Sequence, residues 1–131
     1  MTAPRDAASE DTVSAFLTAQ RAHDWSRVAD LLAVDVVRRG PDGASCAGRD
    51  DYLRFLREVH TTISGYELDV VRLIWSGDGR VAVAEVRERL VQSNGEPLAV
   101  TEAMVFDIDA QARIARLSVY TRIDPDDSLP G

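Results

Sequence analysis

The first half of the sequence has apolar residues at helical spacing, whereas the second half has them at every second position. Residues 9–20 predict a first helix, with acidic residues in its first turn. Residues 25–32 predict a short second helix, because His23-Asp24 interrupts the first. A third helix is predicted to begin at Gly48, followed by two acidic residues. Its apolar face consists of Tyr52, Phe55, Leu56, Val59 and Ile63.

Alternation with a period of two begins after Gly65 and predicts four long strands. Turn-forming residues such as Ser93-Asn94-Gly95 separate them, so we expect hairpins and antiparallel pairing. A shorter strand is predicted at Val34–Arg39, before a turn at residues 40–43. Helices followed by strands are typical of an α+β fold. The four long strands are Tyr66–Trp75, Arg80–Gln92, Leu98–Asp109 and Arg113–Ile123.

A length of 131 residues suits one domain, which we place at residues 9–123, with flexible tails at 1–8 and 124–131. The 22 acidic and 15 basic residues give a net charge of -7, which disfavours binding to nucleic acid or to an anionic membrane surface. The N-terminus has no apolar signal-peptide core, and no apolar run is long enough to span a membrane. We therefore expect a cytoplasmic protein.

The composition also limits the chemistry. Every basic residue is arginine, so Schiff-base and P-loop lysine chemistry are excluded. The single cysteine, Cys46, cannot form an internal disulfide and is expected to be an incidental thiol. His23 and His60 lie far apart in the sequence, and we expect neither a metal nor a cofactor. His23 is expected at a helix cap or at the surface, whereas His60 borders the apolar face of the third helix and is predicted at the surface, at a pocket rim or in the pocket.

The order of the predicted elements resembles the nuclear transport factor 2-like superfamily, which includes ketosteroid isomerases, limonene-type epoxide hydrolases and SnoaL-like polyketide cyclases. The resemblance covers residues 9–123 and rests on Asp24-Trp25, on Gly48-Arg49-Asp50, and on Val105-Phe106-Asp107 leading to Arg113-Ile114. It implies a cone-shaped α+β barrel, in which three N-terminal helices pack on a strongly curved mixed or antiparallel sheet around a deep apolar pocket. The superfamily also includes non-catalytic binders, so the fold alone does not assign an activity.

The resemblance carries over only part of a ketosteroid isomerase site. The tyrosine acid of those enzymes corresponds to Phe16 and their aspartate base to Gly40, and neither residue can transfer a proton. Their second oxyanion-hole acid corresponds to Glu102. Because only one of the three roles is filled, we do not expect ketosteroid-type proton transfer.

The epoxide hydrolase and cyclase sites carry over less well. The Arg-x-Asp pair of the hydrolases corresponds to Glu85 and Arg87, with the charges in reverse order. The aspartate that both groups of enzymes have on their last strand corresponds to Val119. None of the three known mechanisms is therefore intact.

Alternation divides each strand into two faces, and the resemblance implies which face lines the pocket. In the strand Arg80–Gln92 the odd-numbered residues are expected inside, and in the strand Leu98–Asp109 the even-numbered ones. The predicted lining residues are Phe16, Arg38, Tyr52, Phe55, Val59, Val83, Val100, Met104, Phe106, Leu117, Val119 and Thr121.

Three ionisable residues expected in this apolar pocket are the candidate catalytic residues. Burial is expected to raise the pKa of Glu102, so that it can act as an acid or a base. Arg87 would orient or neutralise an oxyanion, and Glu85 would hold Arg87 in place. The alternative is that Glu85 and Arg87 form a structural ion pair and that Glu102 has no catalytic role.

The opposite sheet face is predicted to be small and apolar, which favours a homodimer formed by packing two such faces together. Its expected members are Ala82, Ala84, Val86, Ala99, Thr101, Ala103, Val105, Ser118 and Tyr120.

Two hypotheses for function follow. The first is a pocket protein that binds a small, largely apolar molecule and acts on it by cofactor-independent acid–base chemistry as an isomerase, cyclase or hydrolase. The second is a non-catalytic ligand-binding or protein-interaction domain of the same fold. A cavity of roughly 300 Å³ or more that reaches Glu102 would favour the first hypothesis, and a filled cone the second.

Overall fold

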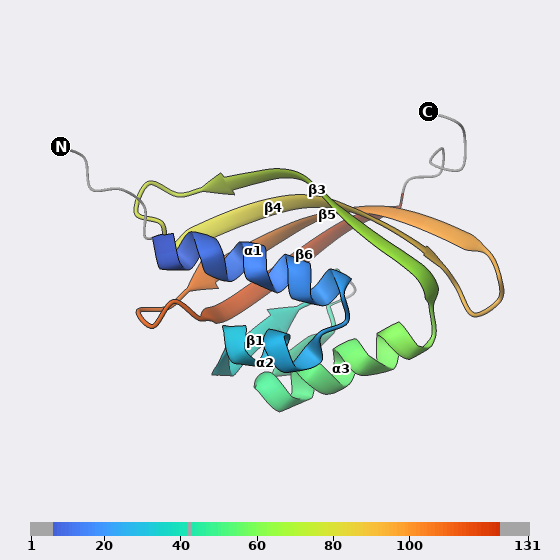
Figure 1. The fold of residues 1–131 in the computed structure, drawn as a ribbon, viewed down its shortest axis with the longest axis horizontal. Helices are drawn as coiled ribbons and strands as arrows, with labels where there is room; N and C mark the ends of the chain where they lie inside the picture. The colour runs from blue at the N-terminus through green and yellow to red at the C-terminus, as the bar shows by residue number, and fades with distance from the viewer. Residues whose placement is uncertain (1–6, 42, 124–131) are drawn as a thin grey trace.

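The computed structural model describes residues 7–41 and 43–123. Three helices lie on one side of a curved, six-stranded sheet (Figure 1). The helices are α1 (Ala7–Arg21), α2 (Trp25–Leu31) and α3 (Arg49–Thr61). The strands are β1 (Leu32–Arg39), β2 (Ser45–Ala47), β3 (Ser64–Trp75), β4 (Val81–Val91), β5 (Pro97–Ile108) and β6 (Ile114–Ile123). The expected tails lie outside the described residues, except that residues 7 and 8 belong to α1.

The strands are arranged in the order β2-β1-β6-β5-β4-β3. All neighbours pair antiparallel except β1 and β6, which pair parallel. The predicted α+β class and mixed sheet are therefore confirmed. The sheet is open rather than closed into a barrel, with β2 and β3 at its edges.

Strand β2 was not predicted, because its three residues are too few to show a periodic pattern. It forms a hairpin with β1 across the predicted turn, of which Asp42 lies outside the described residues. Gly43 has a φ of 82°, a conformation that glycine adopts without steric cost. The amide of Gly40 donates to the carbonyl of Ala44 at 2.8 Å and closes the hairpin.

Helix α1 ends in a Schellman motif, with the amides of His23 and Asp24 donating to the carbonyls of Gln20 and Ala19 at 3.1 and 2.8 Å. His23 is the left-handed residue of this motif, with a φ of 57°. The Asp24 carboxylate then accepts from the amide of Arg27 at 3.2 Å and caps α2. The His23-Asp24 pair therefore separates the two helices, as predicted.

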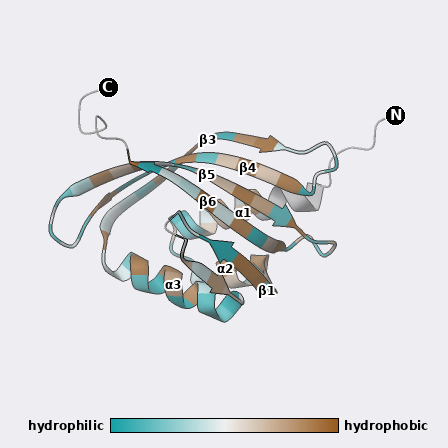
Figure 2. Ribbon diagram, turned by 180° about the vertical axis from the view of Figure 1, so that it is seen from behind, coloured by the Kyte–Doolittle hydropathy of each residue, from teal (hydrophilic) through white to brown (hydrophobic). Residues whose placement is uncertain are grey.

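The core lies between the helices and the face of the sheet that they cover, which we call the inner face. Phe16 of α1 and Phe106 of β5 meet there edge to face, with ring centroids 5.6 Å apart. Helix α3 contributes the buried Tyr52 and Leu56, and its amphipathic character is visible as alternating bands in Figure 2. No helix among the described residues is both long enough and apolar enough to span a membrane.

The side-chain direction predicted for β4 is wrong. Ala82, Ala84 and Val86 are fully buried on the inner face, whereas the odd-numbered residues point to the opposite, outer face. The cross-strand register fixes this direction, because Val86 pairs with Glu102 and paired residues share a face. The directions predicted for β5 and β6 agree with the burial of Val100, Met104 and Phe106 and of Leu117 and Val119, respectively.

Candidate functional site

A cavity of about 270 Å³ is lined by α3 and by the inner face of the sheet. Eight of the predicted lining residues surround it together with Glu102, and its volume is close to the lower end of the range for ligand pockets. These eight are Arg38, Tyr52, Phe55, Val59, Val100, Met104, Val119 and Thr121.

Four predicted lining residues lie elsewhere. Phe16, Phe106 and Leu117 are completely buried in the core and do not line the cavity, because their side chains fill the space between α1 and the sheet. Val83 points to the outer face, like every odd-numbered residue of β4.

A hydrogen-bonded group of five side chains, which we call the carboxylate network, spans the cavity wall. Its members come from α1, β3, β4, β5 and β6: Gln20, Tyr66, Glu88, Glu102 and Thr121. The Gln20 amide donates to the Tyr66 hydroxyl at 3.2 Å, and that hydroxyl donates to Glu88. At the other end of the network, the Thr121 hydroxyl donates to Glu102 at 3.2 Å. The network therefore holds two carboxyl groups inside an apolar wall.

The two carboxyl groups meet because β4 and β5 pair in register. Glu88 lies opposite Val100, and Glu102 lies opposite Val86 on the same face, so the two glutamates are diagonal neighbours. Burial, followed by the hydrogen bond and the charge of Glu88, raises the pKa of Glu102 to about 9. Thr121 and Arg38 oppose this shift without cancelling it. Glu102 therefore carries a proton at neutral pH.

Two tyrosines of the cavity wall also keep their protons. Burial raises the pKa of the Tyr66 phenol far above its usual range, and the neighbouring Glu88 raises it further. Burial likewise raises the pKa of the completely buried Tyr52, although Arg38 acts in the opposite direction. Both phenols are therefore hydrogen-bond donors rather than bases.

Two buried polar atoms of the lining have no hydrogen-bond partner among the described residues: Oε1 of Gln20 and Nε of Arg38. The Arg38 guanidinium lies 4.5 Å from the ring centroid of Phe55, a cation–π contact that holds it against the wall. Buried polar atoms without partners are rare in folded proteins. A bound molecule could therefore donate to Gln20 and accept from Arg38.

His60 lines the cavity, which is one of the alternatives that the sequence left open for this residue. Its Nδ1 lies 2.9 Å from Nε2 of His23, and we call these two residues the imidazole pair. Burial and then the neighbouring His23 lower the pKa of His60, while Glu88 raises it. The net effect favours a neutral imidazole.

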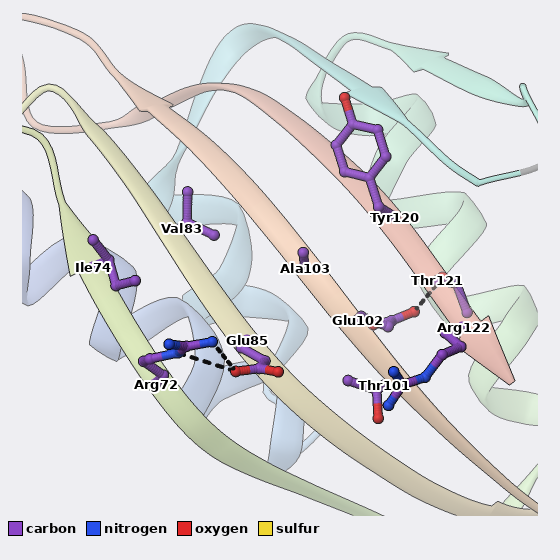
Figure 3. A pocket seen from close by; sticks show the side chains of 10 residues that line it. All are labelled: Arg72, Ile74, Val83, Glu85, Thr101, Glu102, Ala103, Tyr120, Thr121 and Arg122. Atoms are coloured by element: carbon purple, nitrogen blue, oxygen red, sulfur yellow. Dashed lines mark hydrogen bonds and ion pairs between the residues drawn. The ribbon is translucent and has the colours of Figure 1, made fainter. Parts of the chain in front are cut away.

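The placement of Glu85 and Arg87 inside the pocket is wrong, because both lie on the outer face of β4. Glu85 pairs with Arg72 of β3 instead, with 3.0 Å between Nη2 and Oε1. Figure 3 looks onto this face with the helices behind the strands, where a groove of about 350 Å³ lies between Arg72, Tyr120 and Arg122. The geometry therefore leaves Glu85 and Arg87 no access to the interior cavity.

Sequence reasoning missed Gln20, Tyr66 and Glu88 as site residues. The signal for Glu88 was present, since it is the one charged residue among the even-numbered positions 82–90 of β4. Tyr66 and Gln20 carried no such signal, because only the packing of α1 beside β3 brings them together.

Cys46 is buried in β2, and burial raises the pKa of its thiol, which lowers its reactivity. Within the described part of the chain, no three side chains of His, Cys, Asp or Glu are grouped as a metal site would require.

Comparison with known proteins identifies relatives of this fold. Residues 13–117 match the model of the SnoaL-like domain. A limonene epoxide hydrolase-like enzyme of Mycobacterium tuberculosis superposes with a TM-score of 0.77 at 22% identity, covering 91% of this chain and 86% of that one. A steroid delta-isomerase of Pseudomonas aeruginosa has a TM-score of 0.71 at 24% identity, covering 91% and 82%. An NTF2-like protein of unknown function from Burkholderia pseudomallei has a TM-score of 0.78 at 23% identity, covering 93% and 95%. No curated protein matches the sequence.

Proposed function

Because the chain belongs to the SnoaL-like domain family of the nuclear transport factor 2-like superfamily, we propose that it binds a small, largely apolar molecule in the interior cavity and acts on it by acid–base chemistry. The observation that carries this proposal is the pair of neighbouring carboxyl groups, Glu88 and Glu102, in the wall of an otherwise largely apolar cavity, where burial raises the pKa of Glu102. The reaction class is an isomerisation, cyclisation or hydrolysis that needs no cofactor.

Glu102 has the properties of a general acid. The neutral carboxyl group of Glu102 has one O–H, which it donates to Glu88 and can redirect to an oxygen atom of a bound molecule, as a hydrogen bond or as the proton itself. Glu88 stabilises the protonated form, because two adjacent carboxylates inside a protein repel each other. Thr121 orients the acid by donating to its Oε2 atom. The same position corresponds to the oxyanion-hole acid of ketosteroid isomerases.

The unpartnered atoms of the lining define the kind of molecule that fits. Arg38 can donate to an oxygen of the ligand, and Gln20 can accept from a hydroxyl or amine of the ligand. The remaining wall is formed mostly by aliphatic and aromatic side chains, which favour an apolar skeleton. We therefore propose a ligand with an apolar body and one or two oxygen functions.

The proposal is tested by proton exchange into a simple ketone. The probe is 1-tetralone in deuterium oxide, and NMR measures the replacement of hydrogen at the carbon next to the carbonyl group. We expect the wild type to accelerate the exchange and Glu102→Gln to lower its rate constant about 10²-fold. Glu85→Gln, the same change on the outer face, is the matched control and is expected to retain the wild-type rate. Full exchange activity in Glu102→Gln would contradict the role of Glu102 as the acid, and a wild-type rate equal to that of the buffer would contradict the enzyme assignment.

A non-catalytic binder of the same ligand class is the second candidate. It is favoured by the replacement of the catalytic residues of the known mechanisms by Phe16, Gly40 and Val119. In that case 1-tetralone would bind, as measured by NMR line broadening, but its exchange rate would equal that of the buffer.

We also propose that two copies of the chain associate through their outer sheet faces. Large apolar side chains are exposed on this face, including Ile74 at 51% and Tyr120 at 62%. The small residue Ala103 lies beside Tyr120 on this face and would allow two sheets to approach closely.

A further inference from the structure

We propose that His60 is the base that complements Glu102, and that His23 receives the proton from His60 and passes it to solvent. This inference rests on the proposed function, because His60 would be the second proton-transfer group of the same cavity. Glu102 is protonated, both lining phenols are hydrogen-bond donors, and the Glu88 carboxylate already accepts from Tyr66 and Glu102, so none of these four groups is free to remove a proton at neutral pH. A neutral imidazole can do so.

The imidazole pair connects the cavity to the protein surface. His60 lies on α3, is half-buried and lines the cavity, whereas His23 lies in the turn between α1 and α2 and is exposed. Their hydrogen bond of 2.9 Å joins the two environments. Trp25 and Tyr66 hold His60 edge to face, with centroids 5.1 and 4.7 Å away. The orientation of His60 is therefore fixed by three aromatic or imidazole rings.

His23 occupies a position that is usually glycine. As the left-handed residue of the Schellman motif, it has a φ of 57°. Its ring stacks on Trp25 at 5.4 Å with an interplanar angle of 13°. Unfavourable backbone conformations are concentrated at functional sites. A need for an imidazole ring beside His60 would explain why residue 23 is histidine and not glycine.

The proton transfer balances as follows. In the tautomer in which Nδ1 of His60 donates to Nε2 of His23, Nε2 of His60 has a free lone pair. This lone pair takes the proton from the carbon next to a ligand carbonyl, and the electron pair of the broken C–H bond moves onto the carbonyl oxygen. Glu102 donates a hydrogen bond to the resulting enolate. The Nδ1 proton moves to Nε2 of His23, which exchanges protons with solvent. When Nε2 of His60 gives a proton back to carbon, His23 returns one to Nδ1, which completes an isomerisation or, where solvent has first replaced the Nε2 proton, an exchange.

The pH dependence follows from the groups that face His60. These are His23 from the α1–α2 turn, Glu88 from β4 and the phenol of Tyr66 from β3. Burial and His23 lower the pKa of His60, whereas Glu88 raises it. The exchange rate should therefore fall at acidic pH, as the imidazole pair takes up a proton. It should fall again at alkaline pH, as Glu102 loses its own.

The first test is the 1-tetralone exchange in histidine variants. We expect His60→Gln to lower the rate constant about 10²-fold and to remove the acidic limb of the pH profile. His23→Asn preserves the left-handed backbone, which asparagine tolerates, and is expected to lower the rate about tenfold and to shift the acidic limb. Arg57→Gln, an exposed change on the same helix, is the control.

The second test needs no turnover. The probe is 4-nitrophenol, which is half ionised close to neutral pH and mimics an enolate when ionised. We expect the ¹⁵N NMR signals of His60 to change from neutral imidazole to imidazolium when the probe binds at pH 7. Signals that stay neutral in the bound state would overturn the inference.

The outcomes separate this inference from the proposed function. Wild-type exchange rates in His60→Gln, with a reduced rate in Glu102→Gln, would overturn the role of His60 and leave the function intact. No exchange in the wild type, with imidazolium formed on binding of 4-nitrophenol, would contradict catalysis and support His60 as the proton acceptor. No exchange and no imidazolium would overturn both.

Discussion

At the scale of single residues, the proposed acid–base chemistry depends on whether Glu102 carries a proton. Glu102 is placed among apolar side chains and beside a second carboxyl group, and both factors favour its neutral form. Desolvation acts first, because an ion inside a protein loses its hydration. Glu88 acts in the same direction through its charge and hydrogen bond. The resulting acid is held by side chains from several strands, so its position does not depend on a flexible loop.

The raised pKa of Glu102 predicts a specific pH dependence of stability. In the folded chain the proton is retained up to a pH of about 9, whereas the unfolded chain releases it near the ordinary value of 4.5. Between these two values unfolding releases a proton, so the free energy of unfolding falls as pH rises, by at most about 1.4 kcal/mol per pH unit. Glu102→Gln removes this contribution, and its stability relative to the wild type should increase steadily from pH 5 to pH 9.

Urea denaturation at pH 5, 7 and 9 measures this effect. Glu85→Gln is again the matched control, because its carboxylate lies on the outer face with Arg72 and should leave the slope unchanged. Parallel pH profiles for the wild type and Glu102→Gln would show that Glu102 is already ionised in the folded protein.

At the scale of secondary-structure elements, the orientation of the β4 side chains determines which charged residues face the cavity. The even positions of the strand are apolar except for Glu88, whereas the odd positions include three charged residues, Glu85, Arg87 and Arg89. Ala84 is fully buried against the helices, whereas Val83 lines the outer groove. Ala84→Leu should therefore destabilise the protein by about 1–3 kcal/mol through overpacking. Val83→Leu should change the stability by less than about 0.5 kcal/mol.

Urea denaturation of the two variants, at one protein concentration, tests this assignment. The reverse order of stabilities would mean that the odd-numbered residues of β4 are the buried ones and that Glu85 and Arg87 face the interior.

The Arg72–Glu85 pair links β3 to β4 on the outer face and makes a small contribution to stability. Its side chains are 65% and 34% exposed, and ion pairs of this kind contribute about 0.2–1 kcal/mol. At a protein concentration low enough for the chain to be monomeric, a double-mutant cycle with Arg72→Gln and Glu85→Gln should give a coupling within this range, which decreases as salt is added. A coupling energy of several kcal/mol would indicate that the pair is desolvated, as it would be inside an interface.

Much of this architecture could be predicted from the sequence. The change from helical spacing to alternation located three helices and four long strands to within a few residues, because each element has a long periodic pattern. The sequence pattern also indicated which side chains of β4 face the helices, since Ala82, Ala84 and Val86 form a small, uncharged set at alternate positions. The predicted side-chain orientation was wrong because it was taken from the family resemblance and not from the hydrophobicity of the strand itself. The imidazole pair could not be predicted, because it depends on how the α1–α2 turn packs against α3.

At the scale of the whole molecule, the open sheet has two faces with different roles. The helices cover the inner face, which contains the cavity and the carboxylate network. No helix of the described residues lies over the outer face, as Figures 1 and 2 show from opposite sides. An exposed sheet face with large apolar side chains favours association with another protein surface. The predicted outer face was only partly right, because Ala82, Ala84 and Val86 lie on the inner face and charged side chains such as Arg72 and Glu85 lie on the outer one. A second copy of this chain would place the same apolar and oppositely charged residues on both sides of the interface.

Sedimentation of the wild type should show a dimer, and Ala103→Glu should weaken it at least tenfold. Ala103 lies in the middle of the outer face, opposite Glu85 on one neighbouring strand and Tyr120 on the other. A glutamate there would bring a second carboxylate next to Glu85, and it would have to lose its hydration when the two sheets pack. The free-energy cost of this desolvation is well above the roughly 1.4 kcal/mol that corresponds to a tenfold change in the dissociation constant. Val34→Glu, at an exposed apolar position of β1, is the control for added negative charge. Because the cavity lies on the other side of the sheet, the monomeric variant should retain the 1-tetralone exchange rate. A wild type that sediments as a monomer would contradict the pairing of the outer faces, but it would not affect the assignment of Glu102.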